Sequence, residues 1–386
     1  MVQDIVSKYK ELYRLDPVVV RSPGRVNLIG EHTDYNNGFV LPAAINKEIY
    51  FALAPNGTNM FNAYSFDLEE SASFDLDKIE KSDIRWANYL LGVIAQLQRA
   101  GHTIKGFNLV FGGDIPIGAG LSSSAAVECG LAYGLNYLYA LNIDKLDLVK
   151  MAQKAEHEFA GVMCGIMDQF ASMFGKYDRV VKLDCRSLEY HYYDLDMHDY
   201  RIVLLDTQVK HSLASSEYNT RRQECETGVA ILHQHHPEVN SLRDATLEML
   251  AQHQAEFDPV VYKRCKYVVE ENLRVEGACQ DLERKDMAAF GEKMFASHQG
   301  LQHDYEVSCP ELDFLADLAR KNEAVLGARM MGGGFGGCTI NLVKLDQVGA
   351  YIQQMEDAYE QKFGIKMKAY IAEIVNGSSL VSSPVS

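Results

Sequence analysis

The order of apolar and polar positions divides the first half of the chain into short strands followed by helices. Runs rich in β-branched and aromatic residues predict four strands, at 18–20, 26–29, 49–53 and 107–111. Apolar positions then recur at helical spacing over 122–138 and 145–160. The first half is therefore expected to be α+β.

The second half again mixes strands and helices. The run RIVLLDT after Tyr200 predicts a buried strand, and helical spacing follows over 216–233 and 258–277. A glycine turn and the strand TINLV come later. We place the domain boundary near residue 200, with lobes at 1–199 and 200–386. The small polar residues of the last stretch, NGSSLVSSPVS, predict a loose tail.

Composition narrows the class of protein. A chain of 386 residues, 47% hydrophobic and 23% charged, favours two folded lobes over one compact domain or a disordered chain. The formal net charge of −16 argues against nucleic acid and anionic membranes as partners, because both would be repelled. No apolar run approaches the roughly 18 residues of a membrane span. The eight scattered cysteines predict free thiols and a cytoplasmic location.

A glycine- and serine-rich loop, GGDIPIGAGLSSSAA at 112–126, lies between the strand FNLVF and the helix that follows. The unpaired N–H groups and dipole of a helix N-terminus suit phosphate oxygens. Gly118 and Gly120 allow close approach of the backbone, and the hydroxyls of 122–124 add donors. A helix capped by serine is the alternative. Three serines in a row between glycines and alanines favour the phosphate site, although no Walker A motif is present.

Two acidic residues follow the loop. Glu156 shares a helix face with apolar residues, so its carboxylate needs a partner. That partner is either Mg²⁺, which prefers oxygen ligands, or a lysine or arginine in a salt bridge. Asp168 falls in the first turn of a new helix, where it can accept a proton from a substrate hydroxyl. Helix stabilisation alone explains such an aspartate more simply.

A polar cluster near the N-terminus follows the strand RVNLIG. Arg25, Glu31, His32, Asp34 and Asn36 lie within a dozen residues that end in an Asn-Gly turn. Carboxylates, imidazoles and amides of this kind bind the hydroxyls of a sugar. A solvated loop has a similar composition and is the more common meaning of such a cluster.

Three motifs resemble one enzyme family in the order in which that family carries them. PGRVNLIGEHTDYN at 23–36 resembles the galactokinase signature, and IPIGAGLSSSAA at 115–126 is similar to the ATP loop of the GHMP small-molecule kinases. MGGGFGGCTINLV at 331–343 resembles their C-terminal glycine motif. Four shorter segments, RWANY, CGIMDQF, LDCRS and SEYNTRR, also resemble galactokinases.

The resemblance implies a two-lobed α+β fold, with a ribosomal-protein-S5 domain 2-like N-terminal lobe and a ferredoxin-like C-terminal lobe around the active site. It implies an enzyme that transfers the ATP γ-phosphoryl group to the C1 hydroxyl of α-D-galactose, and we expect this enzyme to be a monomer. Galactose and ATP would be its partners, Mg²⁺ its cofactor, and galactose 1-phosphate and ADP its products.

The resemblance also assigns roles to particular residues. Asp168 would be the catalytic base and Arg25 its charged partner. The sugar would be held by Glu31, His32, Thr33, Asp34, Gly165 and Tyr218. ATP would be held by Gly118, Ala119, Gly120, Leu121, Ser122, Ser123, Ser124, Trp86 and Tyr89. Ser124 and Glu156 would be the Mg²⁺ ligands.

The sequence is also compatible with two related functions. A kinase for N-acetylgalactosamine or another C1-hydroxyl sugar shares the EHTD segment, and related regulators bind galactose and ATP without catalysis. A dinucleotide turn at 332–337 fails, because a strand rather than a helix follows the glycines. His233, His235 and His236 close a helix before Pro237 and are interpreted as surface residues.

Overall fold

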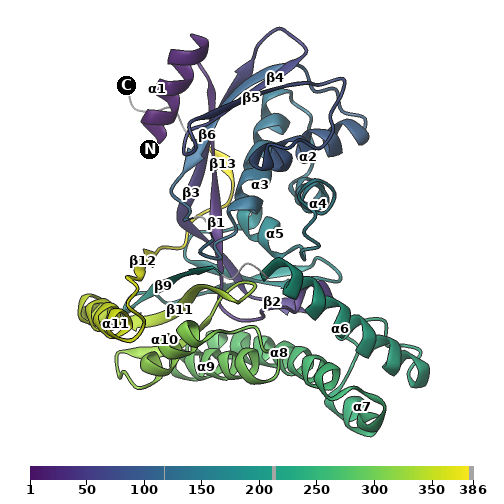
Figure 1. Ribbon diagram of the computed structural model, residues 1–386, viewed down its shortest axis with the longest axis vertical. Helices are drawn as coiled ribbons and strands as arrows, with labels where there is room; N and C mark the ends of the chain where they lie inside the picture. The colour runs from purple at the N-terminus through teal and green to yellow at the C-terminus, as the bar shows by residue number, and fades with distance from the viewer. Residues whose placement is uncertain (117, 211–213, 382–386) are drawn as a thin grey trace.

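The computed structural model describes residues 1–116, 118–210 and 214–381. The chain forms two lobes, each built on its own main sheet (Figure 1). The mixture of strands and helices predicted for both halves is confirmed.

A six-stranded sheet with the order β13-β1-β3-β6-β4-β5 forms the centre of the first lobe. Its strands are β1 (Val18–Asn27), β3 (Pro42–Pro55), β4 (Met60–Ser65), β5 (Glu70–Asp75), β6 (Phe107–Gly113) and β13 (Ser379–Leu380). Neighbouring strands are antiparallel except for β4 and β6, which run parallel. A smaller sheet with the order β2-β7-β8 contains β2 (Phe39–Val40), β7 (Arg179–Asp184) and β8 (Tyr190–Asp194).

Helices cover both faces of the six-stranded sheet (Figure 1). They are α1 (Val2–Tyr13) on one face and, on the other side, α2 (Arg85–Arg99), α3 (Ser123–Leu138), α4 (Lys145–Ala155) and α5 (Met167–Phe174). Ile5 and Tyr9 of α1 pack on Ala52 and Val110. The opposite face carries the larger apolar core. Burial on both faces explains the long buried runs of β3 and β6, whereas β4 alternates and the edge strand β5 is mostly exposed.

A four-stranded antiparallel sheet with the order β10-β11-β9-β12 organises the second lobe. Its strands are β9 (Tyr200–Lys210), β10 (Val325–Met330), β11 (Gly336–Lys344) and β12 (Lys368–Ala372). Side chains alternate between the faces of a strand. Val203 and Leu205 of β9 face the core of the second lobe, whereas Ile202 and Leu204 join the core shared with the first lobe. The two lobes are therefore packed together through β9.

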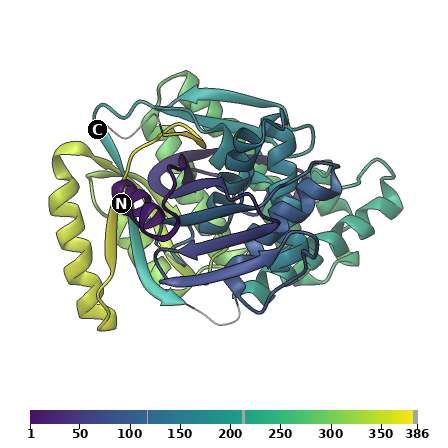
Figure 2. The same cartoon turned by 90° about the horizontal axis from the view of Figure 1, so that it is seen from above.

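The remaining helices belong to the second lobe. They are α6 (Ala214–His235), α7 (Leu247–Gln252), α8 (Pro259–Glu283), α9 (Met287–His303), α10 (Pro310–Arg320) and α11 (Val348–Phe363), with single 3-10 turns at Gln254–Glu256 and Leu345–Gln347. Another 3-10 turn, Asp34–Asn36, lies in the first lobe. Asp258 caps α8 by accepting from the Val260 N–H, and Pro259 occupies its first turn. Figure 2 shows α11 and the α6–α7 end on opposite sides of the molecule.

Several predicted boundaries need correction. The strands predicted at 18–20 and 26–29 form one strand, β1, whose register shifts between Pro23 and Arg25. Such an irregularity accommodates proline and glycine inside a sheet. The predicted helix over 258–277 continues to Glu283, and a Cβ on Gly277 would lie 2.7 Å from the Lys293 side chain on α9. Gly277 therefore permits close helix packing instead of ending the helix.

The predicted loose tail is wrong for its first residues. Ser379 and Leu380 pair with β1, and the hydroxyl of Ser378 is hydrogen-bonded to that of Ser22 at 2.9 Å. Residues 382–386 of the tail lie outside the described residues. The chain after β12 thus returns to the first lobe, although β9 begins the second sheet at Tyr200. The division into 1–199 and 200–386 stays a prediction.

Candidate active site

The centre of the candidate site is an ion pair between Arg25 on β1 and Asp168 in the first turn of α5. The Nε and Nη2 atoms of Arg25 donate to the two carboxylate oxygens of Asp168 at 2.7 and 2.9 Å. Arg25 is only 4% exposed, and its Nη1 atom donates to the carbonyl of Gly120 at 2.7 Å. A bidentate pair fixes the plane of the carboxylate as well as its charge. The sequence predicted this juxtaposition only through family resemblance.

The glycine- and serine-rich loop leads directly to this ion pair. Gly118 and Gly120 have positive φ values of 82° and 76°, and Ser122 is also left-handed, with φ 58°. The Ser122 hydroxyl does not cap α3 but donates to Asp168. The N-terminus of α3 therefore remains available to an anion, as the phosphate interpretation requires. Ile117 lies outside the described residues.

The glycine turn of the second lobe packs against this loop. A Cβ on Gly332 would lie 3.5 Å from the Gly120 backbone, and one on Gly337 would lie 3.5 Å from the Ala119 backbone. Gly332 and Gly337 have φ values of 83° and 80°. The strand β11 follows the turn, so the strand predicted after these glycines is confirmed. Both lobes thus shape the candidate phosphate site.

Glu31 connects the N-terminal polar cluster to that glycine turn. Its Oε1 atom accepts from the Gly332 N–H at 2.8 Å and from Arg329 at 3.1 Å. Arg329 is fully buried and also donates to the carbonyls of Leu28 and Asn27. Glu31 therefore holds the two lobes in register beside the ion pair.

Thr33 has a different environment from its neighbours in the cluster. Its side chain is fully buried, and its hydroxyl lies 2.9 Å from the carbonyl of Gly30 and 2.6 Å from that of Phe39. These contacts fit a residue that holds the loop in shape. A direct contact between Thr33 and a sugar stays a prediction.

His32 is buried beside three tyrosine rings. Its ring lies 5.4 Å from that of Tyr218 and 4.9 Å from that of Tyr305, and its Nδ1 atom is 2.8 Å from the Tyr35 hydroxyl. Burial, reinforced by the charge of Arg221, lowers the pKa of His32 to about 3. The Nε2 atom is buried and makes no well-aligned hydrogen bond within the described residues, although the Gly333 backbone lies close. A neutral ring with an unused nitrogen suits a polar ligand.

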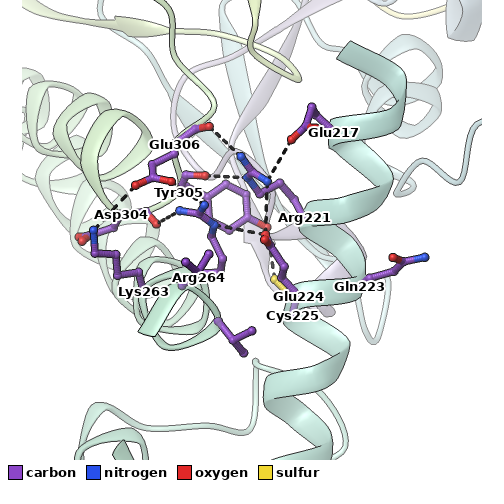
Figure 3. A network of polar contacts seen from close by, with 12 residues as sticks. Glu217, Arg221, Gln223, Glu224, Cys225, Lys263, Arg264, Asp304, Tyr305 and Glu306 are labelled. Atoms are coloured by element: carbon purple, nitrogen blue, oxygen red, sulfur yellow. Dashed lines mark hydrogen bonds and ion pairs between the residues drawn. The ribbon is translucent and has the colours of Figure 1, made fainter. Parts of the chain in front are cut away.

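A polar network surrounds Tyr305 (Figure 3). The Tyr305 hydroxyl lies 2.7 Å from that of Tyr35 and 3.3 Å from the Cys225 sulfur. Arg221 on α6 donates to the carbonyl of Tyr305 at 2.8 Å, and Arg264 on α8 donates to that of Asp304 at 2.6 Å. The network joins α6 and α8 to the segment after α9. Tyr305 contacts Tyr35, which in turn contacts His32. Because Arg221 holds the backbone of Tyr305, this series of contacts keeps the His32 ring in place.

Asp34 faces both Gly165 and the ion pair. A Cβ on Gly165 would lie 2.0 Å from the Asp34 carboxylate, so any larger residue there would displace the carboxylate. Burial first, and then the Asp168 charge, raise the pKa of Asp34 to about 7, while the Tyr35 N–H opposes the shift. The carboxyl therefore exchanges its proton near neutral pH. The structure thus brings Asp34, Gly165 and Asp168 together.

A second acidic site lies where α4 passes into the π-turn Glu156–Ala160. The carboxylates of Glu156 and Glu128 share the amide nitrogen of Gln169, at 2.7 and 3.2 Å. Burial and the charge of Glu156 raise the pKa of Glu128 well above its usual range. One carboxylate oxygen of Glu128 is buried and makes no well-aligned hydrogen bond in the described part of the chain, although the Glu156 carboxyl lies close. The oxygens of this pair suit a divalent cation.

Glu128 was not among the predicted site residues. It lies four positions after Ser124 on α3, so both side chains project from one helix face. The Ser124 side chain in turn lies close to Glu156 and opposes the rise in the pKa of that carboxyl. The i, i+4 relation to Ser124 was the one signal in the sequence that could have identified Glu128.

Trp86 and Tyr89 lie half-buried on α2. The Trp86 Nε1 atom donates to Glu70 at 2.7 Å, and its ring lies 5.5 Å from that of Phe111. Burial, followed by the charges of Glu156 and Glu128, raises the pKa of Tyr89. Tyr89 therefore lies near the acidic pair. An adenine contact for either residue stays a prediction.

Two further observations concern the rest of the molecule. A cavity of about 810 Å³ lies between β8, the 195–202 segment and the end of α8, and none of the predicted site residues line it. Within the described ranges, no helix combines the length and apolar character needed to cross a membrane.

Comparisons with known proteins agree with this geometry. Residues 7–55 match the galactokinase galactose-binding signature, 88–176 the GHMP kinase N-terminal domain and 278–361 the GHMP kinase C-terminal domain. Galactokinase from Thermotoga maritima is 43% identical over 358 residues, covering 93% of this chain and 98% of the relative. Galactokinase from Clostridium acetobutylicum is 43% identical over 390 residues, covering 97% of this chain and 98% of the relative.

A solved structure extends the similarity to three dimensions. Lactococcus lactis galactokinase complexed with galactose superposes with a TM-score of 0.94 at 38% identity, covering 98% of this chain and 99% of that one. The predicted two-lobed GHMP kinase fold is confirmed by these matches. The chain belongs to the galactokinase family of the GHMP kinases.

Proposed function

We propose that this chain is an ATP-dependent galactokinase that phosphorylates the C1 hydroxyl of α-D-galactose, giving α-D-galactose 1-phosphate and ADP. The observation that carries the proposal is the position of the Arg25–Asp168 pair. It lies between a helix N-terminus suited to phosphate, reached through Ser122, and a polyol-type cluster, reached through Asp34. A phosphoryl transfer to a sugar needs a proton acceptor at that junction.

The sugar would be held by the polar cluster and its neighbours. His32 has an unused buried nitrogen, Asp34 a carboxylate that titrates near neutral pH, and Tyr218 a ring beside both. Together they offer one mixed donor and acceptor, one strong acceptor and one hydroxyl, as neighbouring sugar hydroxyls require. Glu31 and Gly165 would shape this pocket by fixing the backbone and the Asp34 carboxylate.

ATP would bind with its phosphates at the start of α3. Backbone N–H groups of the 118–124 loop and the serine hydroxyls would receive the phosphate oxygens. Ser124, Glu156 and the neighbouring Glu128 would hold Mg²⁺, whose charge offsets that of the phosphates when it is bound. The fit is supported by two buried carboxyl groups side by side whose hydrogen-bond partners in the described residues include no cation.

The chemistry assigned to the chain is positioning and proton transfer. Asp168 would accept the proton of the C1 hydroxyl as that oxygen forms its bond to the γ-phosphorus and the bond to the ADP oxygen breaks. Arg25 holds both Asp168 oxygens and so fixes the direction of the acceptor. Its guanidinium charge would also stabilise the negative charge on the transferring group.

An assay of ADP release tests the function directly. Purified protein with Mg²⁺-ATP should turn over galactose much faster than N-acetylgalactosamine, arabinose, glucose or mevalonate. No release with galactose would refute the proposal. Faster ADP release with N-acetylgalactosamine would show that this sugar is the preferred substrate, while the proposed C1 phosphorylation would stand.

We further propose that the enzyme works as a monomer in the cytoplasm. Its eight cysteines are free thiols, as a reducing compartment favours. Light scattering at working concentration should give a mass close to that of one chain. A dimer mass would refute the monomer.

A further inference from the structure

Three histidines at the end of α6 have no part in the proposed galactokinase site. His233, His235 and His236 close this helix, and His233 and His235 are exposed. The ends of α6 and α7 form an outer edge of the second lobe (Figure 1). The sequence alone gave these histidines no partner for a metal, because the residues that complete the group lie further along the chain.

The fold brings His253 and Glu256 to His235. The Nε2 atom of His235 lies 2.7 Å from one Glu256 oxygen, and the Nδ1 atom of His253 lies 2.9 Å from the other. The two imidazole rings stack with centroids 4.0 Å apart and planes 15° apart. The three potential ligand atoms all lie within 4.8 Å of one another.

We propose that His235, His253 and Glu256 form a binding site for a divalent transition-metal ion of the zinc class. Two imidazole nitrogens with one carboxylate oxygen are a ligand set that zinc accepts in proteins. Magnesium and calcium prefer sites made of oxygen alone, so this site differs in kind from the Glu128–Glu156 pair.

Local structure explains why two of the ligands point the same way. His253 and Glu256 are three residues apart across the 3-10 turn Gln254–Glu256, where side chains at i and i+3 eclipse one another. The His236 ring meets the His253 ring edge-on, at 5.4 Å and 77°, and limits its movement. His253 is therefore the fixed member of the group.

Binding requires only small side-chain movements. Each hydrogen bond in the group is a proton shared between an imidazole nitrogen and the carboxylate, and a cation can take the place of both protons. A tetrahedral zinc ion holds its donor atoms about 3.3 Å apart. The side chains of His235 and Glu256 are 37% and 44% exposed, so they can rotate to reach that spacing. A water molecule would complete the fourth position.

A bound ion would tie the end of α6 to the segment after α7. Because the unfolded chain does not hold these three groups together, binding would stabilise the folded state. The effect would be structural, and phosphorylation of galactose would not depend on it.

The test uses untagged full-length protein in buffer with millimolar Mg²⁺, which occupies the oxygen-rich site. Calorimetric titration with Zn²⁺ should show one ion per chain, and Co²⁺ should give the visible absorption of a tetrahedral site. His253→Ala and Glu256→Gln should each weaken Zn²⁺ binding at least about tenfold. His233→Ala on the same helix is the matched control and should bind as the parent does.

Three outcomes would overturn the proposal: no Zn²⁺ binding by the parent, equal binding by the parent and both ligand variants, or equal loss in the control. Equal binding would place the ion at the thiols instead. Turnover of galactose is measured alongside for all variants and should be unchanged. The metal site and the galactokinase assignment can therefore fail separately.

Discussion

Two acidic groups lie close together in the first lobe but have opposite surroundings: Asp168 is half-buried, and the Glu128–Glu156 pair is buried. Asp168 forms a bidentate ion pair with the Arg25 guanidinium and accepts a further hydrogen bond from Ser122. The Glu128–Glu156 pair has no cationic side chain among its hydrogen-bond partners in the described residues and shares the neutral amide of Gln169. Burial raises the pKa of both glutamates.

The difference separates two uses of a carboxylate. A guanidinium built into the fold fixes an acceptor in place before any ligand arrives. A pair of carboxylates without such a partner is unfavourable when charged, because burial in low dielectric and mutual repulsion both disfavour ionisation. That pair reaches full charge only when a cation arrives. In the proposed mechanism the base is therefore preformed, whereas the proposed metal site would be completed by its ligand.

The largest predicted effect is at the preformed carboxylate. Asp168→Asn keeps an oxygen for Arg25 but cannot accept a proton, so kcat should fall roughly 10³–10⁴-fold. Asp168→Ala should lose at least as much. Galactose binding measured by calorimetry should stay within a few-fold in the Asn variant. A kcat near that of the parent would remove Asp168 from its role as base.

Removing one member of the other pair should cost less. Glu156→Gln deletes a proposed Mg²⁺ ligand but leaves Glu128 and Ser124, so kcat should fall about 100-fold. The Mg²⁺ concentration for half-maximal rate should rise, because fewer charged oxygens remain. Asp168→Asn supplies the matched control, since its Mg²⁺ dependence should be unchanged. An equal rise in the Mg²⁺ requirement of both variants would contradict the proposed difference between Asp168 and the Glu128–Glu156 pair.

Asp34 is intermediate between the carboxylate paired with arginine and the carboxylates that have no cationic partner. It lies near Arg25, yet its carboxyl has a pKa raised to about 7. A sugar hydroxyl donating to its carboxylate would lower that pKa in the complex. Galactose binding near pH 6 should then release up to about one proton, and affinity should weaken up to tenfold per pH unit below 7. Titrations in buffers of different ionisation enthalpy measure the release. Asp34→Asn should release none; equal release would assign the proton elsewhere.

Sequence patterns predicted the elements that span the core and missed those that depend on distant partners. The helix over 122–138 and the strand RIVLLDT were found because their apolar residues face packed cores. The residues 379–380 were predicted to be loose, since their strand exists only through pairing with β1. A two-residue strand carries too little periodicity to be recognised.

Site residues that belong to a family motif could be predicted from the sequence. Site residues that are brought together only by the fold could not. Family resemblance placed Arg25 and Asp168 in one site, 143 residues apart in sequence, and they are paired. Glu128 lies on an apolar helix face, and apart from its i, i+4 relation to Ser124 nothing in the sequence points to it; its closeness to Glu156 is visible only in the fold. Likewise, the contact between the His32 and Tyr305 rings can be found only in the structure, because 273 residues separate them in the sequence.

The smallest predicted effect concerns stability rather than rate. Glu128→Gln replaces a buried acid by a neutral group of the same shape, so the Mg²⁺-free protein should be more stable at pH 8 by about 1–3 kcal/mol. The sign follows from linkage. Above the ordinary pKa of 4.5, the folded parent retains a proton at Glu128 that the unfolded chain has lost, so its stability falls as pH rises. The gain should therefore shrink towards pH 5.

Urea unfolding at pH 5 and pH 8, with and without Mg²⁺-ATP, measures this gain. Saturating Mg²⁺-ATP should reverse it, because the parent then binds the cation with both carboxylates and the variant with one. A surface change such as Glu238→Gln, on an exposed residue, is the control and should shift stability by less than about 0.5 kcal/mol. If Glu128→Gln destabilises the Mg²⁺-free protein, the pair is held by its hydrogen bonds alone, and the contrast with the Arg25–Asp168 pair fails.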